Sequence, residues 1–161
     1  MSDRISAEDQ QIVEKIYPAL RRFAAMVASW EVDPDDVLQE ALFRVLARRE
    51  LSSLDHPVAY LRKTMLNLVR DEQRQVRSRT RAMVTIGVPD PTTDIYPSDL
   101  DGLGELTPQG RAALFMAEVE GCSYSEIGTA LGCSEVAARM AAMRARRQLR
   151  THLDSEVSDE R

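Results

Sequence analysis

The 161-residue sequence is poor in aromatic residues, which make up 5% of the chain and include a single tryptophan. A core must therefore be built from Leu, Val, Ile, Ala and Met, a set that suits packed helices better than β-sandwiches. Residues of high helix propensity dominate, and alternating strand patterns are few. The sequence therefore predicts an all-α fold.

Cysteine and long hydrophobic runs are also scarce. Cys122 and Cys133 match no metal-ligand spacing, and His56 and His152 lie far from them in sequence. We therefore expect no metal and no cofactor, and we interpret the cysteines as small buried thiols in a reducing compartment. No apolar run of about 18 residues and no signal-peptide segment is present, which predicts a cytoplasmic protein without membrane contact of its own.

Lysine is nearly absent, because only Lys15 and Lys63 are lysines among 21 basic residues. Arginine suits bidentate contacts to phosphate or guanine, but a GC-rich genome gives the same bias, and both explanations stay open. The formal net charge of −5 hides a segregation of charge: residues 82–110 hold no Lys or Arg, whereas residues 136–153 hold arginines and no acid. Local fields decide where a polyanion binds, so the C-terminal segment is a candidate nucleic-acid surface.

Apolar residues at spacings of three and four predict three helices in the first half of the chain. The first begins after the N-cap Ser6, and Pro18 predicts a kink or break near Tyr17. The second begins at Asp33 or Pro34, and the third covers residues 58–75.

A segment rich in proline, glycine and acidic residues separates this part of the chain from the rest. It covers residues 82–105 and predicts an extended, self-repelling linker, since it is too long and too polar for a compact loop. We expect two small helical domains, residues 1–81 and 106–154, joined by this acidic flexible linker. Residues 155–161 are expected to form an acidic, frayed tail.

The C-terminal half shows a short helix, a tight turn and a longer helix. Thr107 and Pro108 predict the start of a helix that Gly121 ends. A short helix over residues 124–131 and a turn at Gly132 come next. Ser134 then caps a last helix to about Leu153. The core that fixes the crossing of the last two helices is predicted to contain Ile127, Leu131, Val136 and Met140. This is the helix-turn-helix pattern of DNA-binding proteins, and the alternative is an ordinary helical hairpin with solvated arginines.

Two further segments carry candidate functional side chains. Residues 33–40 contain paired carboxylates, which the helix dipole explains without chemistry; because no nucleophile motif or phosphate loop accompanies them, we expect a docking surface for a basic partner and no enzyme activity. In residues 60–74, basic side chains can hold phosphates, Tyr60 can stack on a base and Asn67 can read a base edge. The alternative for this segment is a solvated amphipathic helix.

Taken in order, these segments resemble the extracytoplasmic-function sigma factors of bacteria. Residues 33–41 are similar to the family's D-x-E-D-L-V-Q-E-A run, and residues 60–74 to its W-L-x(6)-N-x(3)-D-x(2)-R helix, with Tyr60 in the tryptophan position. Residues 106–111 resemble L-P-x-x-x-R, residues 120–128 resemble E-G-x-S-Y-x-E-I-A, and residues 144–149 resemble R-A-R-x-x-L. The resemblance extends from about residue 12 to residue 150.

The resemblance implies a factor that directs core RNA polymerase to specific promoters and initiates transcription. Its implied partners are the β′ clamp helices and β flap of core RNA polymerase, promoter DNA and an anti-sigma factor. The implied polymerase-binding residues are Asp35, Asp36, Gln39 and Glu40. The implied contacts to the −10 element are Ser53, Asp55, His56, Tyr60, Arg62, Lys63, Asn67, Arg70 and Arg74. The implied contacts to the −35 element are Ser134, Glu135, Ala138, Arg139, Met143, Arg144, Arg146 and Arg147.

The recognition helix departs from the family pattern, which reads G-T-V-K-S-R-L where this chain has Val136–Ala142. Arg139 stands alone in that stretch, so the −35 preference is the open question. Two alternatives remain at this point. A sigma-like decoy would bind an anti-sigma factor, and a stand-alone helix-turn-helix repressor would not need residues 33–75.

Overall fold

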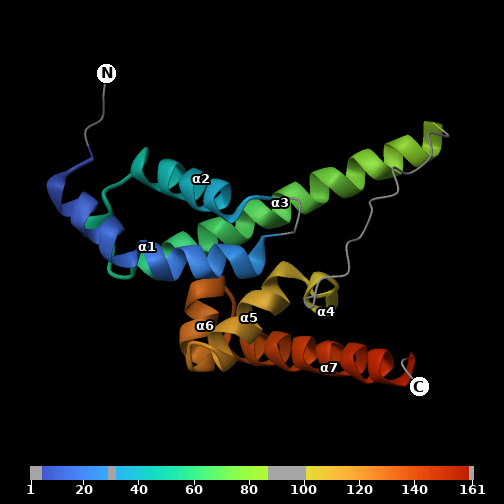
Figure 1. Ribbon diagram of the computed structural model, residues 1–161. Helices are drawn as coiled ribbons and strands as arrows, with labels where there is room; N and C mark the ends of the chain where they lie inside the picture. The colour runs from blue at the N-terminus through green and yellow to red at the C-terminus, as the bar shows by residue number, and fades with distance from the viewer. Residues whose placement is uncertain (1–4, 29–31, 87–100, 160–161) are drawn as a thin grey trace.

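The computed structural model describes residues 5–28, 32–86 and 101–159, and in those residues every regular element is a helix (Figure 1). The predicted all-α class is confirmed. The N-terminal elements are α1 (Ala7–Val27), α2 (Pro34–Leu46), the 3₁₀ turn η1 (Leu51–Ser53) and α3 (Pro57–Ile86). The C-terminal elements are α4 (Asp101–Gly104), α5 (Pro108–Glu118), α6 (Tyr124–Leu131) and α7 (Glu135–Asp159). Most of the predicted linker, residues 87–100, lies outside the described residues.

Helix α1 begins as predicted and continues further than predicted. The Ser6 hydroxyl accepts from the Asp9 N–H at 3.0 Å, which caps the helix. The break expected near Tyr17 is absent, because α1 runs without interruption through Pro18 to Val27. Pro18 is exposed, while Leu20 and Phe23 on the buried face are fully covered. Packing on that face compensates for the hydrogen bond that proline removes.

Two helices extend past their predicted ends. Helix α3 reaches Ile86 instead of Gln75, and α7 reaches Asp159 instead of Leu153. The apolar stripe of α3 ends near Val69, after which described residues as far as Ala82 are mostly exposed. Arginine and alanine are strong helix formers, and Arg77, Arg79, Arg81 and Ala82 let α3 stay helical without a buried face. Helix α7 continues to Asp159 through the segment predicted to be a tail. The expected frayed tail is therefore wrong for its first residues.

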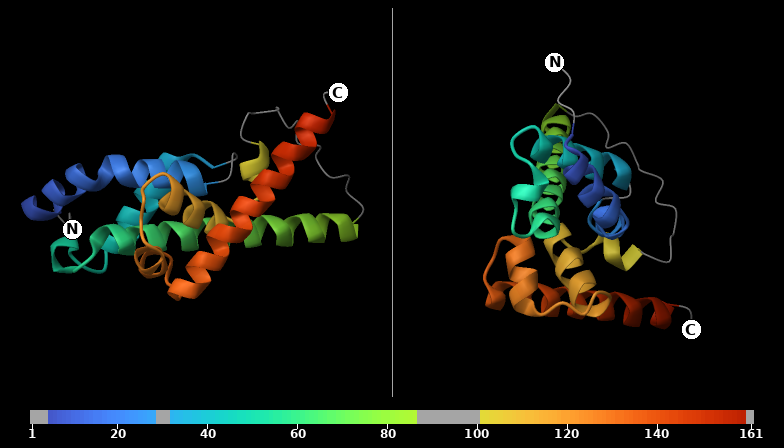
Figure 2. Two further views of the ribbon diagram at one scale, coloured as in Figure 1. Left: turned by 90° about the horizontal axis from the view of Figure 1, so that it is seen from below. Right: turned by 90° about the vertical axis from the view of Figure 1, so that its left-hand side faces the viewer.

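The helices form two layers, seen edge-on in the right-hand view of Figure 2. We call α1–α3 the N-terminal layer and α4–α7 the C-terminal layer. Buried residues of both layers form one continuous cluster, which joins Phe23, Leu61 and Val69 above to Met116 and Ile127 below. In this structure the layers therefore pack against each other.

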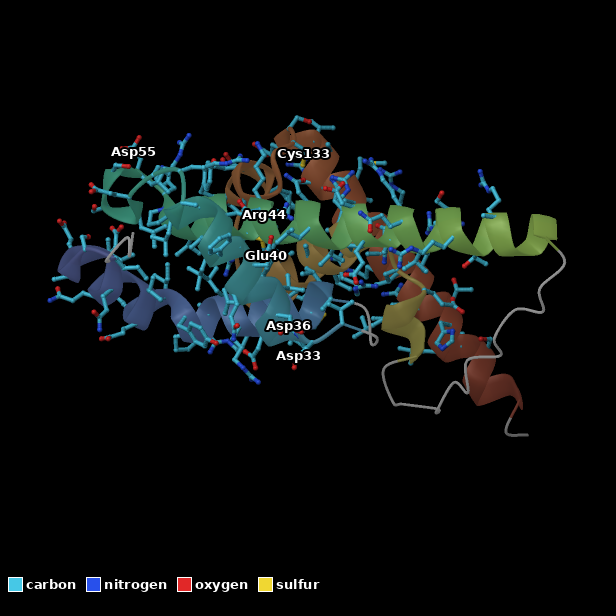
Figure 3. All side chains as sticks on the ribbon, turned by 90° about the horizontal axis from the view of Figure 1, so that it is seen from above. Asp33, Asp36, Glu40, Arg44, Asp55 and Cys133 are labelled. Atoms are coloured by element: carbon cyan, nitrogen blue, oxygen red, sulfur yellow. The ribbon has the colours of Figure 1, made fainter. Side chains whose placement is uncertain are left out.

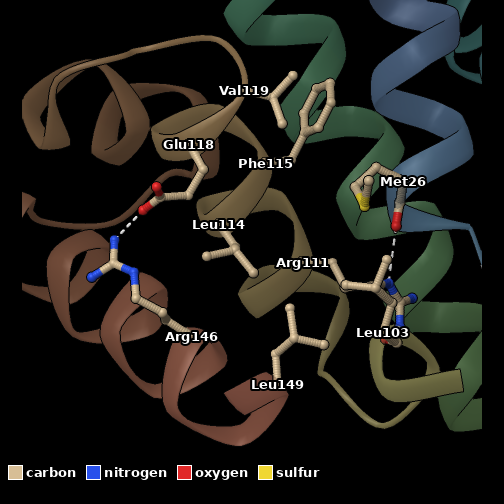
Figure 4. Close-up of a pocket in the computed structure, with 9 residues that line it drawn as sticks. All are labelled: Met26, Leu103, Arg111, Leu114, Phe115, Glu118, Val119, Arg146 and Leu149. Atoms are coloured by element: carbon tan, nitrogen blue, oxygen red, sulfur yellow. Dashed lines mark hydrogen bonds and ion pairs between the residues drawn. The ribbon is translucent and has the colours of Figure 1, made fainter. Parts of the chain in front are cut away.

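Polar contacts also join the layers. Arg62 Nη2 of α3 donates to Glu120 Oε1 at 2.7 Å, and both side chains are largely buried, with exposed fractions of 9% and 17%. Arg111 of α5 is buried and donates to the carbonyl oxygen of Met26 at 3.0 Å (Figure 4). It also donates to the carbonyl oxygen of Val27 at 2.7 Å. The carbonyls at the end of α1 are thus satisfied by a side chain of the other layer.

Helices α6 and α7 are held together by small residues. A Cβ on Gly128 would lie 2.8 Å from the carbonyl oxygen of Cys133, so only glycine allows this approach. Gly132 has φ +69°, as the turn requires. The predicted core is half right: Ile127 and Leu131 are buried, but Val136 and Met140 are exposed. The alanines Ala138 and Ala142 take their place, since α7 turns its alanine face inward.

Candidate functional site

Helix α2 lies on the side of the N-terminal layer away from α5–α7 (Figure 1). Its outer face carries the exposed carboxylates of Asp36 and Glu40. Asp33 caps the helix by accepting from the Asp35 N–H at 2.8 Å. Asp36, Gln39 and Glu40 are exposed, and Figure 3 shows Asp36 and Glu40 in succession along α2. Buried Val37, Leu38, Ala41 and Val45 fix the orientation of this face.

Two of the four residues predicted for polymerase binding have partners within the protein. Glu40 accepts from Arg44 of the same helix at 2.6 Å, whereas Asp35 is paired with another helix. Arg21 of α1 forms two hydrogen bonds to the Asp35 carboxylate, at 2.9 and 3.1 Å, and Tyr17 lies 3.4 Å away. The hydrogen bond from Arg21 holds the pKa of Asp35 below its usual value. Asp35 therefore joins α2 to α1 and is only partly available to a partner.

Sequence reasoning missed Phe43, whose ring is 70% exposed on the same face of α2. It lies three residues after Glu40 and seven after Asp36, so all three share one side of the helix. The apolar stripe of this segment passes through Leu42 and Val45 and leaves Phe43 out of phase. The position of Phe43 outside this stripe was the sequence signal from which its exposure could have been predicted.

One face of α3 carries most of the side chains predicted to contact melted DNA. Tyr60, Lys63 and Asn67 are exposed at helical spacing, and the Arg49 guanidinium lies 5.2 Å from the Tyr60 ring centroid. Arg74 is exposed and Arg70 is half-buried. Ser53, Asp55 and His56, in the loop before α3, are also exposed.

Arg62 does not belong to that face. It follows Tyr60 by two residues, which places it on the opposite side of the helix, among buried Leu61, Met65 and Leu66. Its guanidinium lies 5.1 Å from the Phe23 ring centroid and pairs with Glu120. In this arrangement Arg62 joins the two layers and cannot reach DNA, so its prediction as a DNA contact is wrong for this state.

Lys63 lies beside the turn between α6 and α7. A Cβ on Gly132 would meet the Lys63 Cε at 2.7 Å, so the aliphatic stem of the lysine covers that glycine. The C-terminal layer therefore covers part of the α3 face around Lys63.

The outer face of α7 carries the side chains predicted for the −35 element, with two exceptions. Ser134 caps the helix through the Ala137 N–H at 3.1 Å, Glu135 pairs with Arg139 at 3.0 Å, and Met143, Arg144 and Arg147 are exposed. Ala138 is fully buried and is corrected to a packing residue. Arg146 turns back to pair with Glu118 of α5 (Figure 4).

The described residues contain no group of three or more His, Cys, Asp or Glu side chains placed to hold a metal ion. Cys122 and Cys133 are half-buried free thiols, and burial raises the pKa of Cys122. Within the described part of the chain, no helix is both long and apolar enough to span a bilayer.

Comparison with known proteins gives consistent matches. The family described as Sigma-70, region 4, matches residues 100–149. The chain is 30% identical over 162 residues to the RNA polymerase sigma-E factor of Streptomyces avermitilis, covering 96% of this chain and 89% of that protein. It is 28% identical to the ECF RNA polymerase sigma factor SigE of Mycolicibacterium smegmatis, covering 93% of this chain and 62% of the relative's length. The ferric citrate uptake sigma factor FecI of Escherichia coli is 27% identical, with 83% of this chain and 86% of FecI covered.

A solved structure also matches the fold. The sigma factor RpoE of Bartonella quintana, crystallised in complex with the anti-sigma factor NepR, aligns with a TM-score of 0.64 at 24% identity. The match covers 92% of this chain and 98% of that one. At this identity the likeness shows the fold alone.

The fold, the exposed faces and these matches together define a bacterial RNA polymerase sigma factor. The matches to the full-length relatives span both layers, which a stand-alone repressor built on residues 106–154 would not require. Within this class, the chain belongs to the extracytoplasmic-function family.

Proposed function

We propose that this chain is an initiation subunit that binds core RNA polymerase and directs it to promoters. The observation that carries the proposal is that one small fold presents three outward faces, on α2, α3 and α7, with their orientation fixed by buried residues on the opposite side of each helix. The side chains of the three faces suit three different tasks, which are docking on the polymerase, contacting the −10 element and contacting the −35 element. We propose no catalytic activity for the chain itself.

The α2 face is proposed to dock on the β′ clamp helices. Asp36, Gln39 and Glu40 supply polar and acidic groups for a basic partner, and Phe43 supplies an apolar anchor among them. Asp35 contributes mainly by holding α2 against Arg21.

The α3 face is proposed to open and read the −10 element. Lys63, Arg70 and Arg74 can hold phosphates, while Tyr60 and Asn67 can contact unstacked bases. Arg62 could take part only after the two layers separate, because Glu120 and Phe23 cover it in the packed state.

The outer face of α7 is proposed to read the −35 element. Arg144 and Arg147 are exposed on a helix segment without acids, which suits phosphate contacts. The β flap of the polymerase is the proposed partner that holds the C-terminal layer at the correct distance from the α3 face.

An anti-sigma factor is a further proposed partner, and the proposed location is the cytoplasm, where core polymerase is found. The RpoE structure is a complex with such a regulator. A pure decoy is less well supported, because a decoy needs neither an exposed Asn67 nor an exposed acidic face on α2.

Asn67→Ala tests the −10 assignment, because Asn67 is exposed and its loss should not disturb packing. Holoenzyme with this variant should open promoters poorly while still binding the closed duplex. Permanganate reactivity of melted thymines should fall about tenfold, and duplex affinity should change less than twofold, as expected when one base-edge contact worth roughly 1–3 kcal/mol is removed. Equal loss of binding and opening would count against the assignment.

A further inference from the structure

Helix α7 places three large apolar side chains in solvent at the beginning of its outer face. Val136, Met140 and Met143 have exposed fractions of 68%, 45% and 50%. At about 100° per residue they fall within roughly 60° of one another around the helix. Ala138, Ala142 and Ala145 lie on the opposite side and are 0–2% exposed.

This apolar stripe is therefore the part of α7 that points most directly away from the protein. It covers the first turns of the helix after the Gly132 turn, the positions that enter the major groove in helix-turn-helix proteins. These side chains are contiguous on one helix face and not scattered singly, which is typical of an interaction site.

The charges around the stripe identify that partner as duplex DNA. Arg144, Arg147 and Arg150 are exposed along the same segment, and residues 136–153 contain no acidic residue. Arg139 is also exposed, but it is paired with Glu135 at 3.0 Å. An apolar stripe between cationic side chains matches a groove whose floor is base edges and whose walls are phosphates.

Side chains without polar groups can read one feature of the major groove, the C5-methyl group of thymine. The one acid near the start of the helix, Glu135, is paired with Arg139 at 3.0 Å and is less available to accept from cytosine.

Resting on the proposed function, we propose that Val136, Met140 and Met143 read thymine methyl groups. The promoters of this factor therefore carry thymines at the −35 positions whose major-groove edges α7 contacts. Specificity at these positions comes from burial of methyl groups between apolar side chains and not from hydrogen bonds.

The experiment removes the methyl groups without changing base pairing. Holoenzyme is used to select from duplexes randomised in the −35 segment, once with thymine and once with deoxyuridine in that segment alone. The same selection is run with the Met140→Ala/Met143→Ala variant. Leu153→Ala is the matched control, because Leu153 is 52% exposed on the same helix several turns beyond the stripe.

The thymine library should enrich A·T pairs at fixed positions, and the affinity of the best sequence should fall about fourfold for each methyl group removed. In the double methionine variant this thymine-to-deoxyuridine difference should disappear, while Leu153→Ala should retain it. Equal selection from both libraries by the unmodified protein would overturn the proposal and leave the proposed function intact. Failure to select any duplex would overturn both.

Discussion

Arg62 and Arg111 show how single charged residues join the two layers. Arg62 pairs with Glu120, and Arg111 is surrounded by backbone carbonyls from Met26, Val27, Leu103 and Leu106 at 2.7–3.2 Å. Burial lowers the pKa of Arg111, a cost that these charge-assisted hydrogen bonds offset.

Arg111→Met should therefore destabilise the protein strongly, since it leaves these carbonyls without their donor. We expect the free energy of unfolding to fall by about 3 kcal/mol, measured by urea denaturation followed by circular dichroism. Arg111→Lys should lose less, because it keeps the charge and part of the donor set. An unchanged midpoint in Arg111→Met would contradict the assigned role.

Phe43 is the residue on which the polymerase-docking face can be tested most directly. Phe43→Ala should weaken binding to core polymerase about tenfold or more, as truncation of an aromatic anchor does. Its folding should be unaffected, since the ring is 70% exposed. Val119→Ala is the control, because Val119 is 69% exposed on another surface. Equal affinities of the two variants, measured by fluorescence anisotropy, would remove Phe43 from the interface.

Among the elements, the junction of α6 and α7 depends on local sequence to an unusual degree. Ser123 and Glu126 form a capping box, and its backbone hydrogen bond lowers the pKa of Glu126. Gly128 lets the first turn of α7 approach α6 closely. These features fix how the outer face of α7 is presented.

Gly128→Ala should disturb this junction, because its Cβ would meet backbone and not a flexible side chain. We expect a loss of about 1–3 kcal/mol in the free energy of unfolding, as for overpacked cores. Gly104→Ala is the matched control, since a Cβ there meets nothing within 4 Å. Equal stabilities of the two variants in thermal denaturation would refute the close-packing account.

The sequence was informative about helices wherever it carried caps and periodic apolar residues. Ser6, Thr107 and Ser134 all cap helices as predicted. The sequence-based prediction was wrong about the end of α3 and about the buried face of α7. Helix α3 continues past its apolar stripe, and α7 buries alanines in place of Val136 and Met140. The phase of α7 depends on contacts with α5 and α6, which no pattern within the helix contains.

On the functional faces, the spacing of a residue along its helix decides whether the side chain predicted to contact DNA is exposed or buried. Asn67 and Lys63 follow Tyr60 at seven and three residues and are exposed with it, whereas Arg62 follows at two and is buried. The pairing of Arg62 with Glu120 joins residues 58 positions apart and could not be predicted from local sequence.

At the scale of the whole molecule, the packed layers hold Arg62 away from DNA and set Lys63 against the Gly132 turn. Glu120→Arg should separate the layers, since it places two guanidinium groups together in a largely buried site. We expect a larger radius of gyration by small-angle X-ray scattering and tighter binding of single-stranded −10 DNA. The charge-swapped Arg62→Glu/Glu120→Arg protein should return to the packed dimensions. A Glu120→Arg protein that stays folded with unchanged dimensions would show that this pair does not hold the layers together.

The central claim is that this chain gives core RNA polymerase a promoter preference. Run-off transcription on genomic DNA, with core polymerase in the presence and absence of the protein, tests it most directly when the 5′ ends are sequenced. The account predicts new 5′ ends that share two upstream elements at a fixed spacing, and a decrease of about tenfold in these transcripts with Asn67→Ala. Transcripts that are the same with and without the protein would contradict it.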